Sequence, residues 1–183
     1  MDSLKAQLLV ATPMLGDPNF DRTVVWLLEH GDDGALGVVL NRPSELPVAD
    51  PLPSWDLLTG ELPVVFRGGP VSTESVIGVA RVRTGAPEGA WAPVMGEIGV
   101  LDLGVDPDDV APLLVGLRCF AGYAGWGAGQ LEDEIEQGAW FVVEADPGDP
   151  FTDRPEGLWR SVLARQRPEL ARFALVPDDP TVN

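Results

Sequence analysis

The sequence contains one cysteine and one histidine in 183 residues. Cys119 alone cannot form an intramolecular disulfide, which is typical of a protein kept in a reducing compartment. His30 alone excludes histidine-based metal clusters and mechanisms that need two histidines. No apolar run approaches the roughly 20 residues needed to span a bilayer, and the first residues lack the features of a signal peptide. We therefore expect a cytoplasmic protein with no bound metal or cofactor.

Basic residues are also scarce. The chain has 12 Lys+Arg against 29 Asp+Glu, which gives a formal net charge of −17. Between Glu97 and Asp149, twelve acidic residues accompany a single base, Arg118. Nucleic-acid affinity rests largely on Lys and Arg neutralising phosphates, so this charge disfavours direct binding to DNA or RNA. The same charge is also typical of a protein that simply stays apart from its neighbours in solution.

Glycine is concentrated in one stretch, Phe120–Glu134, which reads FAGYAGWGAGQLEDE. Its glycines, which alternate with Tyr123 and Trp126, are Gly122, Gly125, Gly127 and Gly129. Glycine removes side chains where backbone must approach backbone or where φ must be positive. The stretch fits neither a P-loop nor a GxGxxG pattern, and the acids that follow it would repel a phosphate. We therefore predict that these glycines serve close backbone packing and not nucleotide binding.

The central elements are predicted from β-branched and aromatic runs. Thr23–Glu29 and Leu36–Leu40 predict the two strands of a hairpin, because Asp33-Gly34 between them is a strong turn signal. Arg118–Tyr123 predicts a central strand that leads into the glycines. Gln130–Gln137 predicts a short helix behind them.

The remaining segments complete the predicted fold. Ser44–Pro63 is expected to be a proline-bearing loop that encloses one short helix, and Phe173–Val176 to add an edge strand. Strands and helices interleave without the regular alternation of a parallel βαβ fold. The fold class is therefore α+β, with a mixed, mostly antiparallel sheet. We predict a single domain over residues 1–183, with residues 178–183 as a frayed tail.

No residue pattern defines an active site. The chain has no GxSxG sequence, so Ser–His–Asp catalysis has no candidate serine. Cys119 and His30 could form a thiolate pair, although a lone cysteine on an apparent core strand is typical of a small buried hydrophobe. Asp146, Asp149 and Asp153 could collect a hard cation, but their spacing fits no EF-hand loop.

Three sequence blocks carry a resemblance to a known family. They are ATPMLGDPNFDRTVVWLLEHGDDGALGVVLNRP (Ala11–Pro43), RGGPVS (Arg67–Ser72), and GYAGWGAGQLEDE followed by WFVVEAD (Gly122–Asp146). In this order they resemble the AlgH/YqgE family of bacterial proteins. The resemblance implies a bent, bifurcated sheet wrapped into a barrel-like body with helices packed outside. It also implies a cytosolic protein, and a link to transcriptional control from which no activity follows.

The chain departs from that family at two motif positions, and it also has a longer Gly/Pro-rich stretch at Thr84–Gly96. Members often have proline where Ala128 stands, and a histidine after the strand where Ala80–Arg81 stand here. A ligand role that depends on that second histidine is therefore not expected in this chain.

The candidate ligand-binding residues come from the polar and aromatic positions of these blocks. They are Asp17, Arg22, His30, Asn41, Arg42, Arg67, Tyr123, Trp126, Gln130 and Glu132. If the hairpin, the RGGP turn and the glycine block meet at one end of the sheet, these residues line a shared cleft. The alternative is that His30, Asn41 and Gln130 satisfy backbone groups in irregular loops.

Three functional hypotheses follow. The leading one is a non-enzymatic protein that binds an unknown protein partner or small molecule, with at most an indirect effect on transcription. The first alternative is an enzyme, a hydrolase or transferase, that uses His30 and nearby carboxylates. The second is a DNA-binding transcriptional regulator, disfavoured by the net charge because arginines concentrate only in Arg154–Arg172. We expect no direct nucleic-acid or membrane binding, and a monomer or weak homodimer.

Overall fold

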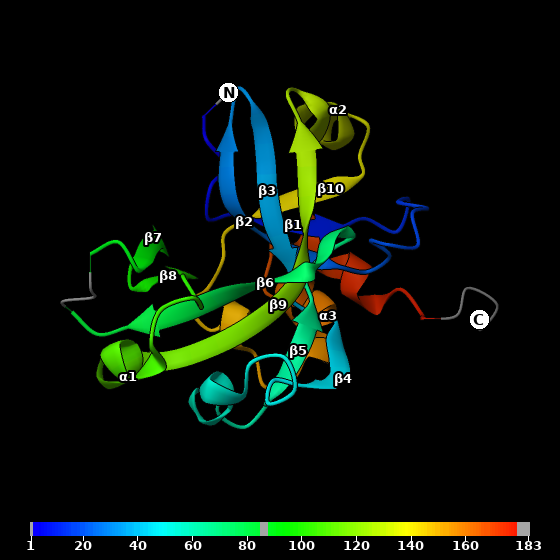
Figure 1. Cartoon of the computed structure of the whole chain (residues 1–183). Coiled ribbons are helices and arrows are strands. Elements are labelled where there is room, and N and C mark those ends of the chain that lie inside the picture. The colour runs from blue at the N-terminus through cyan, green and yellow to red at the C-terminus, as the bar shows by residue number, and fades with distance from the viewer. Residues whose placement is uncertain (1, 85–87, 179–183) are drawn as a thin grey trace.

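One curled sheet dominates the computed structural model, which describes residues 2–84 and 88–178 (Figure 1). Its ten described strands are β1 (Leu8–Ala11), β2 (Val24–Gly31), β3 (Gly34–Val39), β4 (Pro43–Pro47), β5 (Val64–Arg67), β6 (Val71–Val82), β7 (Trp91–Met95), β8 (Ile98–Leu101), β9 (Leu114–Gly127) and β10 (Trp140–Val143). The α-helices are α1 (Pro107–Val110), α2 (Gln130–Glu136), α3 (Leu158–Ala164) and α4 (Pro168–Ala171). The 3-10 helices are η1 (Pro53–Leu58), η2 (Ala111–Leu113), η3 (Asp149–Phe151), η4 (Pro155–Gly157) and η5 (Arg172–Leu175).

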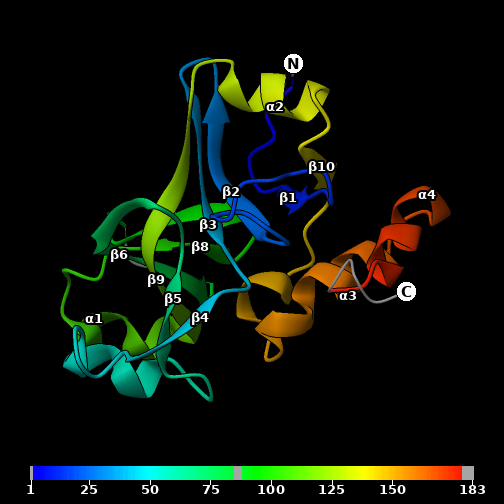
Figure 2. The same ribbon diagram turned by 90° about the vertical axis from the view of Figure 1, so that its right-hand side faces the viewer.

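The predicted α+β class is confirmed. Within the described strands, every pair is antiparallel except β5 with β9, so the sheet is mixed and mostly antiparallel. The sheet bends into a half-barrel, with α2 above it and α3 and α4 to one side in Figure 2. The helices are short because prolines and glycines interrupt the segments between strands.

Strand β9 has 14 residues and the sheet is organised around it. It runs from α1 at one end of the molecule to α2 at the other (Figure 1). Strand β6 pairs along one edge of β9. On the other edge, β3 pairs with residues 124–127 and β5 pairs with Phe120 and Ala121. The sheet therefore forks on this edge, between β3 and β5.

The link between β5 and β6 crosses β9 with backbone against backbone. Because β5 and β6 lie on opposite edges of β9, the three residues Gly68–Pro70 must pass over that strand. A Cβ atom on Gly69 would lie 2.1 Å from the carbonyl carbon of Tyr123, and one on Gly122 would lie 2.4 Å from the Gly69 oxygen. No side chain fits at either position. Close backbone packing, the predicted use of the glycine block, is thus confirmed at Gly122.

Gly122 also interrupts the alternation of side chains between the two faces of β9. Side chains of a strand normally alternate between faces. Phe120 before Gly122 and Tyr123 after it nevertheless pack into the same hydrophobic cluster, around Trp26. The φ of Gly122 is 73°, a left-handed value that disturbs the ladder in the manner of a β-bulge. The two halves of β9 consequently face different surroundings.

The predicted hairpin and the helix after the glycines are both present. Strands β2 and β3 pair from Val25↔Val39 to Gly31↔Gly34, and Gly34 has a φ of 131°. Helix α2 starts after Gly129 and buries Leu131. These elements were predictable because their signals are local.

Two other segments differ from the predictions. The stretch expected to be loop does contain the short helix η1, but its start forms strand β4. Strand β4 pairs with β5 at Pro43↔Phe66 and Pro47↔Val64 and lies at a sheet edge, where proline is tolerated.

The predicted edge strand at Phe173–Val176 is wrong. Most of this segment forms η5, because the Arg160 guanidinium donates to the carbonyls of Ala174 and Val176 and curls the chain. Asp178, the first residue of the expected frayed tail, pairs with Arg22 and Arg160. The rest of that tail, 179–183, lies outside the described residues.

Among the residues that the structure describes, no helix combines the length and the apolar character needed to cross a bilayer.

Candidate functional site

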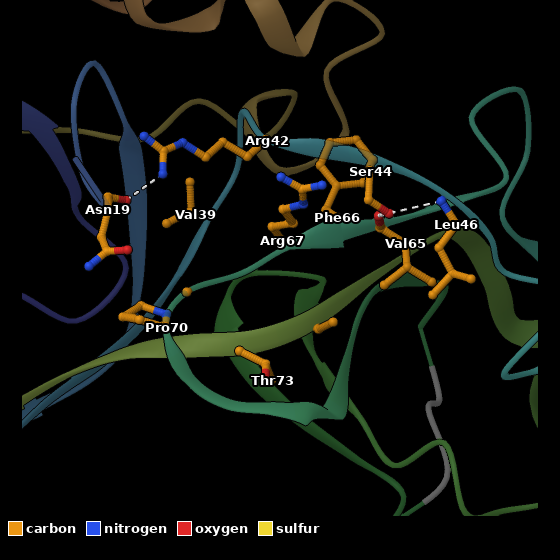
Figure 3. A pocket seen from close by; sticks show the side chains of 12 residues that line it. Asn19, Val39, Arg42, Ser44, Leu46, Val65, Phe66, Arg67, Pro70 and Thr73 are labelled. Atoms are coloured by element: carbon orange, nitrogen blue, oxygen red, sulfur yellow. Dashed lines mark hydrogen bonds between the residues drawn. The ribbon is translucent and has the colours of Figure 1, made fainter.

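A cavity of about 580 Å³ lies at the fork of the sheet (Figure 3). We call it the fork cavity. Its walls come from the end of β3, from β4 and β5, and from the start of β6, with β9 on the remaining side. The lining residues are Asn19, Val39, Arg42, Ser44, Leu46, Val65, Phe66, Arg67, Gly69, Pro70, Thr73 and Ala121. None of these lining residues is acidic, although the chain carries a net charge of −17.

Arg42 holds a loop against the fork cavity. Its guanidinium donates to the carbonyls of Asn19 at 2.5 Å, Asp21 at 3.1 Å and Pro18 at 3.3 Å. Burial lowers the pKa of Arg42, and the positive charge of Arg67 lowers it further, while Asp21 and Asp17 act in the opposite direction. Arg42 therefore positions the wall of the cavity and adds positive potential to it.

Arg67 is the second cation of the fork cavity and differs in its partners. Its side chain is exposed, and no described carboxylate forms a salt bridge with it. In Figure 3 the guanidinium of Arg42 points toward Asn19, whereas that of Arg67 does not share this contact. Arginine presents a planar set of donors that matches carboxylate and phosphate groups. Arg67 can therefore receive an anionic group inside the cavity.

His30 lies at the hairpin end of the sheet, away from the fork cavity. Its Nδ1 accepts a hydrogen bond from the Leu4 amide at 2.9 Å, and its Nε2 lies 2.6 Å from Glu132 Oε1. Because Nδ1 is an acceptor, the proton belongs on Nε2, which donates to the carboxylate. The imidazole is only 4% exposed. Neither ring nitrogen has a lone pair available to take a proton from a substrate.

The surroundings of His30 are acidic. A cavity of about 540 Å³ beside it is lined by Glu29, Asp32 and Asp33, with Lys5 as its one cation among the described residues. The pKa of Glu132 is lowered, first by a hydrogen bond from its own backbone amide and then by the hydrogen bond from His30. The His30–Glu132 contact thus ties α2 to the hairpin, and the Leu4 contact adds the N-terminal segment.

Several other predicted residues satisfy backbone groups. Asn41 accepts from the Val24 amide and donates to the carbonyl of Arg22, which bridges β3 to the start of β2. Gln130 accepts from the amide of Gly127 and so closes the turn before α2. Asp17 accepts from the amide of Asn19 in the same way. These contacts agree with a structural role.

The remaining predicted residues are engaged in packing. Trp126 is 7% exposed and lies edge-on to Trp140, with ring centroids 6.1 Å apart. Tyr123 is partly buried and packs against the hydrophobic cluster that contains Trp26. Arg22 stacks 4.7 Å from the centre of the Trp159 ring and pairs with Asp178. The structure therefore does not bring all the predicted residues into one cleft. Arg42 and Arg67 share the fork cavity, and His30 and Glu132 lie together elsewhere.

The nucleophile and metal hypotheses find no support in the geometry. Cys119 is fully buried, and burial raises the pKa of its thiol to about 12, so it carries no thiolate near neutral pH. Asp149 and Asp146 both pair with Arg165 instead of facing a common cation position. Over residues 2–84 and 88–178, no three metal-ligating side chains come together.

Arg118 is a buried cation that the predicted site omitted. It is 7% exposed, and its Nη1 donates to the carbonyls of Thr152 at 2.7 Å and Pro150 at 3.5 Å. Its guanidinium lies 4.6 Å from the centre of the Phe66 ring, so it stands behind a wall of the fork cavity. Burial lowers the pKa of Arg118 to about 10, and Asp153 partly opposes this. The signal in the sequence was its isolation as the one base in a long acidic segment.

The fold and its cavities define a class of α+β protein whose half-barrel sheet forks around a glycine crossing. The AlgH-like family model (DUF179) matches residues 8–171, and the chain belongs to this family. A UPF0301 protein of Streptomyces avermitilis is 57% identical over 187 residues, which cover 100% of this chain and 97% of the relative. A UPF0301 protein of Streptomyces coelicolor is 56% identical over 188 residues, with the same coverage.

Two solved structures share the fold. A crystal structure of a protein from Corynebacterium diphtheriae superposes with a TM-score of 0.85 at 31% identity, and covers 94% of this chain and 92% of that one. The solution structure of the AlgH protein from Pseudomonas aeruginosa gives a TM-score of 0.67 at 34% identity, over 88% of this chain and 87% of that one. The resemblance to the AlgH/YqgE family is thereby confirmed, and the names of these relatives state no molecular activity.

Proposed function

We propose that this chain is a non-enzymatic binding protein that holds a small organic anion in the fork cavity. The observation that carries the proposal is Arg67, a cation with no salt-bridge partner among the described residues that opens into a cavity free of acidic lining side chains. In a chain of net charge −17, this cavity is a local region of positive potential. Any effect on transcription is indirect, and a cytoplasmic location is part of the proposal.

The shape of the cavity indicates the rest of the ligand. Val39, Leu46, Val65 and Phe66 supply apolar lining, and Figure 3 shows Val39 beside Arg42 and Phe66 beside Arg67. Ligand sites commonly combine such walls with a few placed polar groups, and about 580 Å³ lies within their usual range. The ligand therefore carries a carboxylate or phosphate that pairs with Arg67 and an apolar part that packs against these side chains.

The enzyme alternative has less support. It depends on His30, whose two ring nitrogens are both occupied by Leu4 and Glu132. A general base needs a lone pair within reach of the substrate proton, and His30 offers none without breaking a contact that holds the N-terminal segment.

The DNA-binding alternative also has less support. Its basic stripe would lie in the C-terminal segment, where Arg160 pairs with Asp178 and Arg165 pairs with Asp149. Arginines already neutralised by carboxylates contribute little to phosphate binding.

A thermal-shift screen against a library of metabolite anions tests the proposal. A ligand present at about 100 times its dissociation constant stabilises the fold by about 2.7 kcal/mol. Arg67→Gln should abolish the shift while leaving the unliganded melting temperature unchanged, because its side chain is exposed. The matched control is Arg83→Gln, which removes the same charge from an exposed arginine outside the cavity.

Three outcomes are informative. A shift lost in Arg67→Gln and kept in Arg83→Gln supports the fork cavity as the site. A shift lost equally in both variants would mean that overall charge, not the cavity, governs binding. A screen without any hit would contradict the small-anion proposal and leave a protein partner as the ligand to seek.

A further inference from the structure

A third cavity, of about 330 Å³, lies on the other side of Phe66 from the fork cavity. We call it the Arg118 cavity. It is enclosed by the segment after η1, the start of β9, and the segment around η3. Arg118 lines it with a side chain that is more than nine-tenths buried.

Arg118 has donors without partners. Only its Nη1 makes hydrogen bonds, to two backbone carbonyls, and its Nε and Nη2 bond to no described residue. No carboxylate of the described chain forms a salt bridge with it. Neither of these two donor atoms is closed off from solvent, so an anion that enters the cavity can form charge-assisted hydrogen bonds with both. The guanidinium therefore presents an unfilled position for a carboxylate at the cavity wall.

The other charges of the Arg118 cavity are mixed. Asp153 is close enough to Arg118 to act on its titration, and Glu61 also lines the cavity, with Arg81 as the second cation. The fork cavity, in contrast, has no acidic lining residue. A ligand with negative charge alone would meet repulsion from Asp153 and Glu61, whereas a ligand that also carries a positive group would pair with them.

The apolar part of the cavity sets the third requirement. Leu58, Leu62, Leu117 and Phe151 contribute apolar lining beside the charged groups. Its volume of about 330 Å³ lies at the small end of the 300–1,000 Å³ range of ligand sites, so a small ligand is enough to fill it.

We infer that the Arg118 cavity binds a small zwitterion, an α-amino acid with an apolar side chain. The carboxylate pairs with the Nε and Nη2 donors of Arg118, and the ammonium lies toward Asp153 and Glu61. The side chain packs against the leucines and Phe151. This site is separate from the fork cavity and does not depend on the function proposed for it.

Isothermal titration calorimetry with three matched probes tests the inference on the full chain. L-phenylalanine carries both charges, 3-phenylpropionate lacks the ammonium, and phenethylamine lacks the carboxylate. Phenylalanine should bind saturably, and each of the other two should bind at least roughly tenfold more weakly, since each lacks one charge-assisted contact. Equal affinity for phenylalanine and 3-phenylpropionate, or no saturable binding of phenylalanine at millimolar concentration, would overturn the inference.

Two variants locate the site without altering Arg118. Gly116 lines the cavity, and a Cβ there would stand 3.6 Å from the Phe151 ring, an ordinary contact. Gly116→Val should therefore fill the cavity and abolish phenylalanine binding in a folded protein. Asp153→Asn should weaken phenylalanine binding roughly tenfold and leave that of 3-phenylpropionate unchanged.

The control variant is Arg67→Gln, which alters only the fork cavity and should leave phenylalanine affinity as it is. Circular dichroism establishes that each variant is folded before titration. Phenylalanine binding that survives Gly116→Val, or that is lost in Arg67→Gln, would place the amino acid elsewhere and contradict the inference.

Discussion

The two halves of β9 belong to one strand, but they differ in the cavities and charged contacts around them. Around the first half lie two cavities lined by arginines whose donors are incompletely used, with Arg67 in one and Arg118 in the other. Around the second half, His30 and Glu132 bond to each other and acidic residues line the nearby surface. The first half resembles a binding region. The second half carries a structural contact, His30–Glu132, which ties α2 to the β2–β3 hairpin and which we call the joint.

This difference shows how a strongly acidic chain distributes its few cations. Arg22, Arg160 and Arg165 are paired with carboxylates and hold segments together. Arg67 and Arg118 have no such partner among the described residues and face cavities instead. A cation that faces a cavity without pairing to a carboxylate of the chain makes that cavity a favourable place for an external anion.

The largest effect is expected where the two halves meet. Gly122→Ala places a Cβ 2.4 Å from the Gly69 oxygen in a residue with φ of 73°, so the crossing cannot form. We expect a loss of more than about 4 kcal/mol in the free energy of unfolding, measured by urea denaturation. Gly127→Ala is the control, because its nearest neighbour would be 3.9 Å away, and it should change stability by less than about 1 kcal/mol. Similar losses in both would show that the crossing is not the critical contact.

A smaller effect is expected at the joint. His30→Ala removes the acceptor of the Leu4 amide and the donor to Glu132. We expect a loss of about 1–3 kcal/mol in the free energy of unfolding, and earlier hydrogen exchange at the Leu4 amide. Anion binding in the fork cavity should be unchanged. Lost anion binding in a folded His30→Ala protein would mean that the two halves are coupled, and the comparison above would fail.

The smallest expected effect concerns two glutamates on α2, which should influence stability in opposite directions as the pH changes. The pKa of Glu132 is lowered, by its backbone hydrogen bond and then by His30, whereas burial raises the pKa of Glu134, whose Oε2 has no hydrogen-bond partner among the described residues. A carboxyl whose pKa is lower in the folded protein stabilises the fold at pH values above its unfolded pKa, near 4.3, and this stabilisation is lost as the pH falls through the folded pKa. A carboxyl whose pKa is higher in the folded protein destabilises the fold at high pH, and this destabilisation disappears as the pH falls.

At pH 7, Glu132→Gln should therefore lower the melting temperature and Glu134→Gln should raise it. Each substitution should change the free energy of unfolding by less than about 1 kcal/mol. Both differences from the unsubstituted protein should close toward pH 3. The measurement is thermal unfolding by circular dichroism across this range. Shifts of the same sign at pH 7 would contradict the opposite environments of the two carboxylates.

The sequence predicted those features whose signals are local. The β2–β3 hairpin follows from the Asp33-Gly34 turn, and α2 follows from the run behind Gly129. The failed edge strand shows the limit. The residue types of Phe173–Val176 are typical of a strand, but Arg160 on α3 donates to carbonyls of this segment, which forms a 3-10 turn. A local pattern does not reveal that contact.

The site was predictable to a lesser degree. The motif blocks contained Arg42 and Arg67, which line the same cavity in the structure, but they also suggested one cleft that includes His30, which lies elsewhere. Neighbouring blocks meet at different points along β9, and the spacing of residues in the chain does not give those points. The sequence shows Arg118 as an isolated base. The position of its guanidinium, however, depends on the carbonyls of Pro150 and Thr152, which only the fold brings to it.

The crossing of β9 by Gly68–Pro70 also determines when the fold can be completed during synthesis. Strands β5 and β6 leave the ribosome well before β9. They cannot pair with each other as an ordinary hairpin, because β9 must lie between them. Until β9 has emerged, β3, β5 and β6 each keep an unpaired edge, and such edges recruit other chains. The nascent protein is thus most vulnerable to aggregation over this interval, and a chaperone that shields strand edges would act on it there.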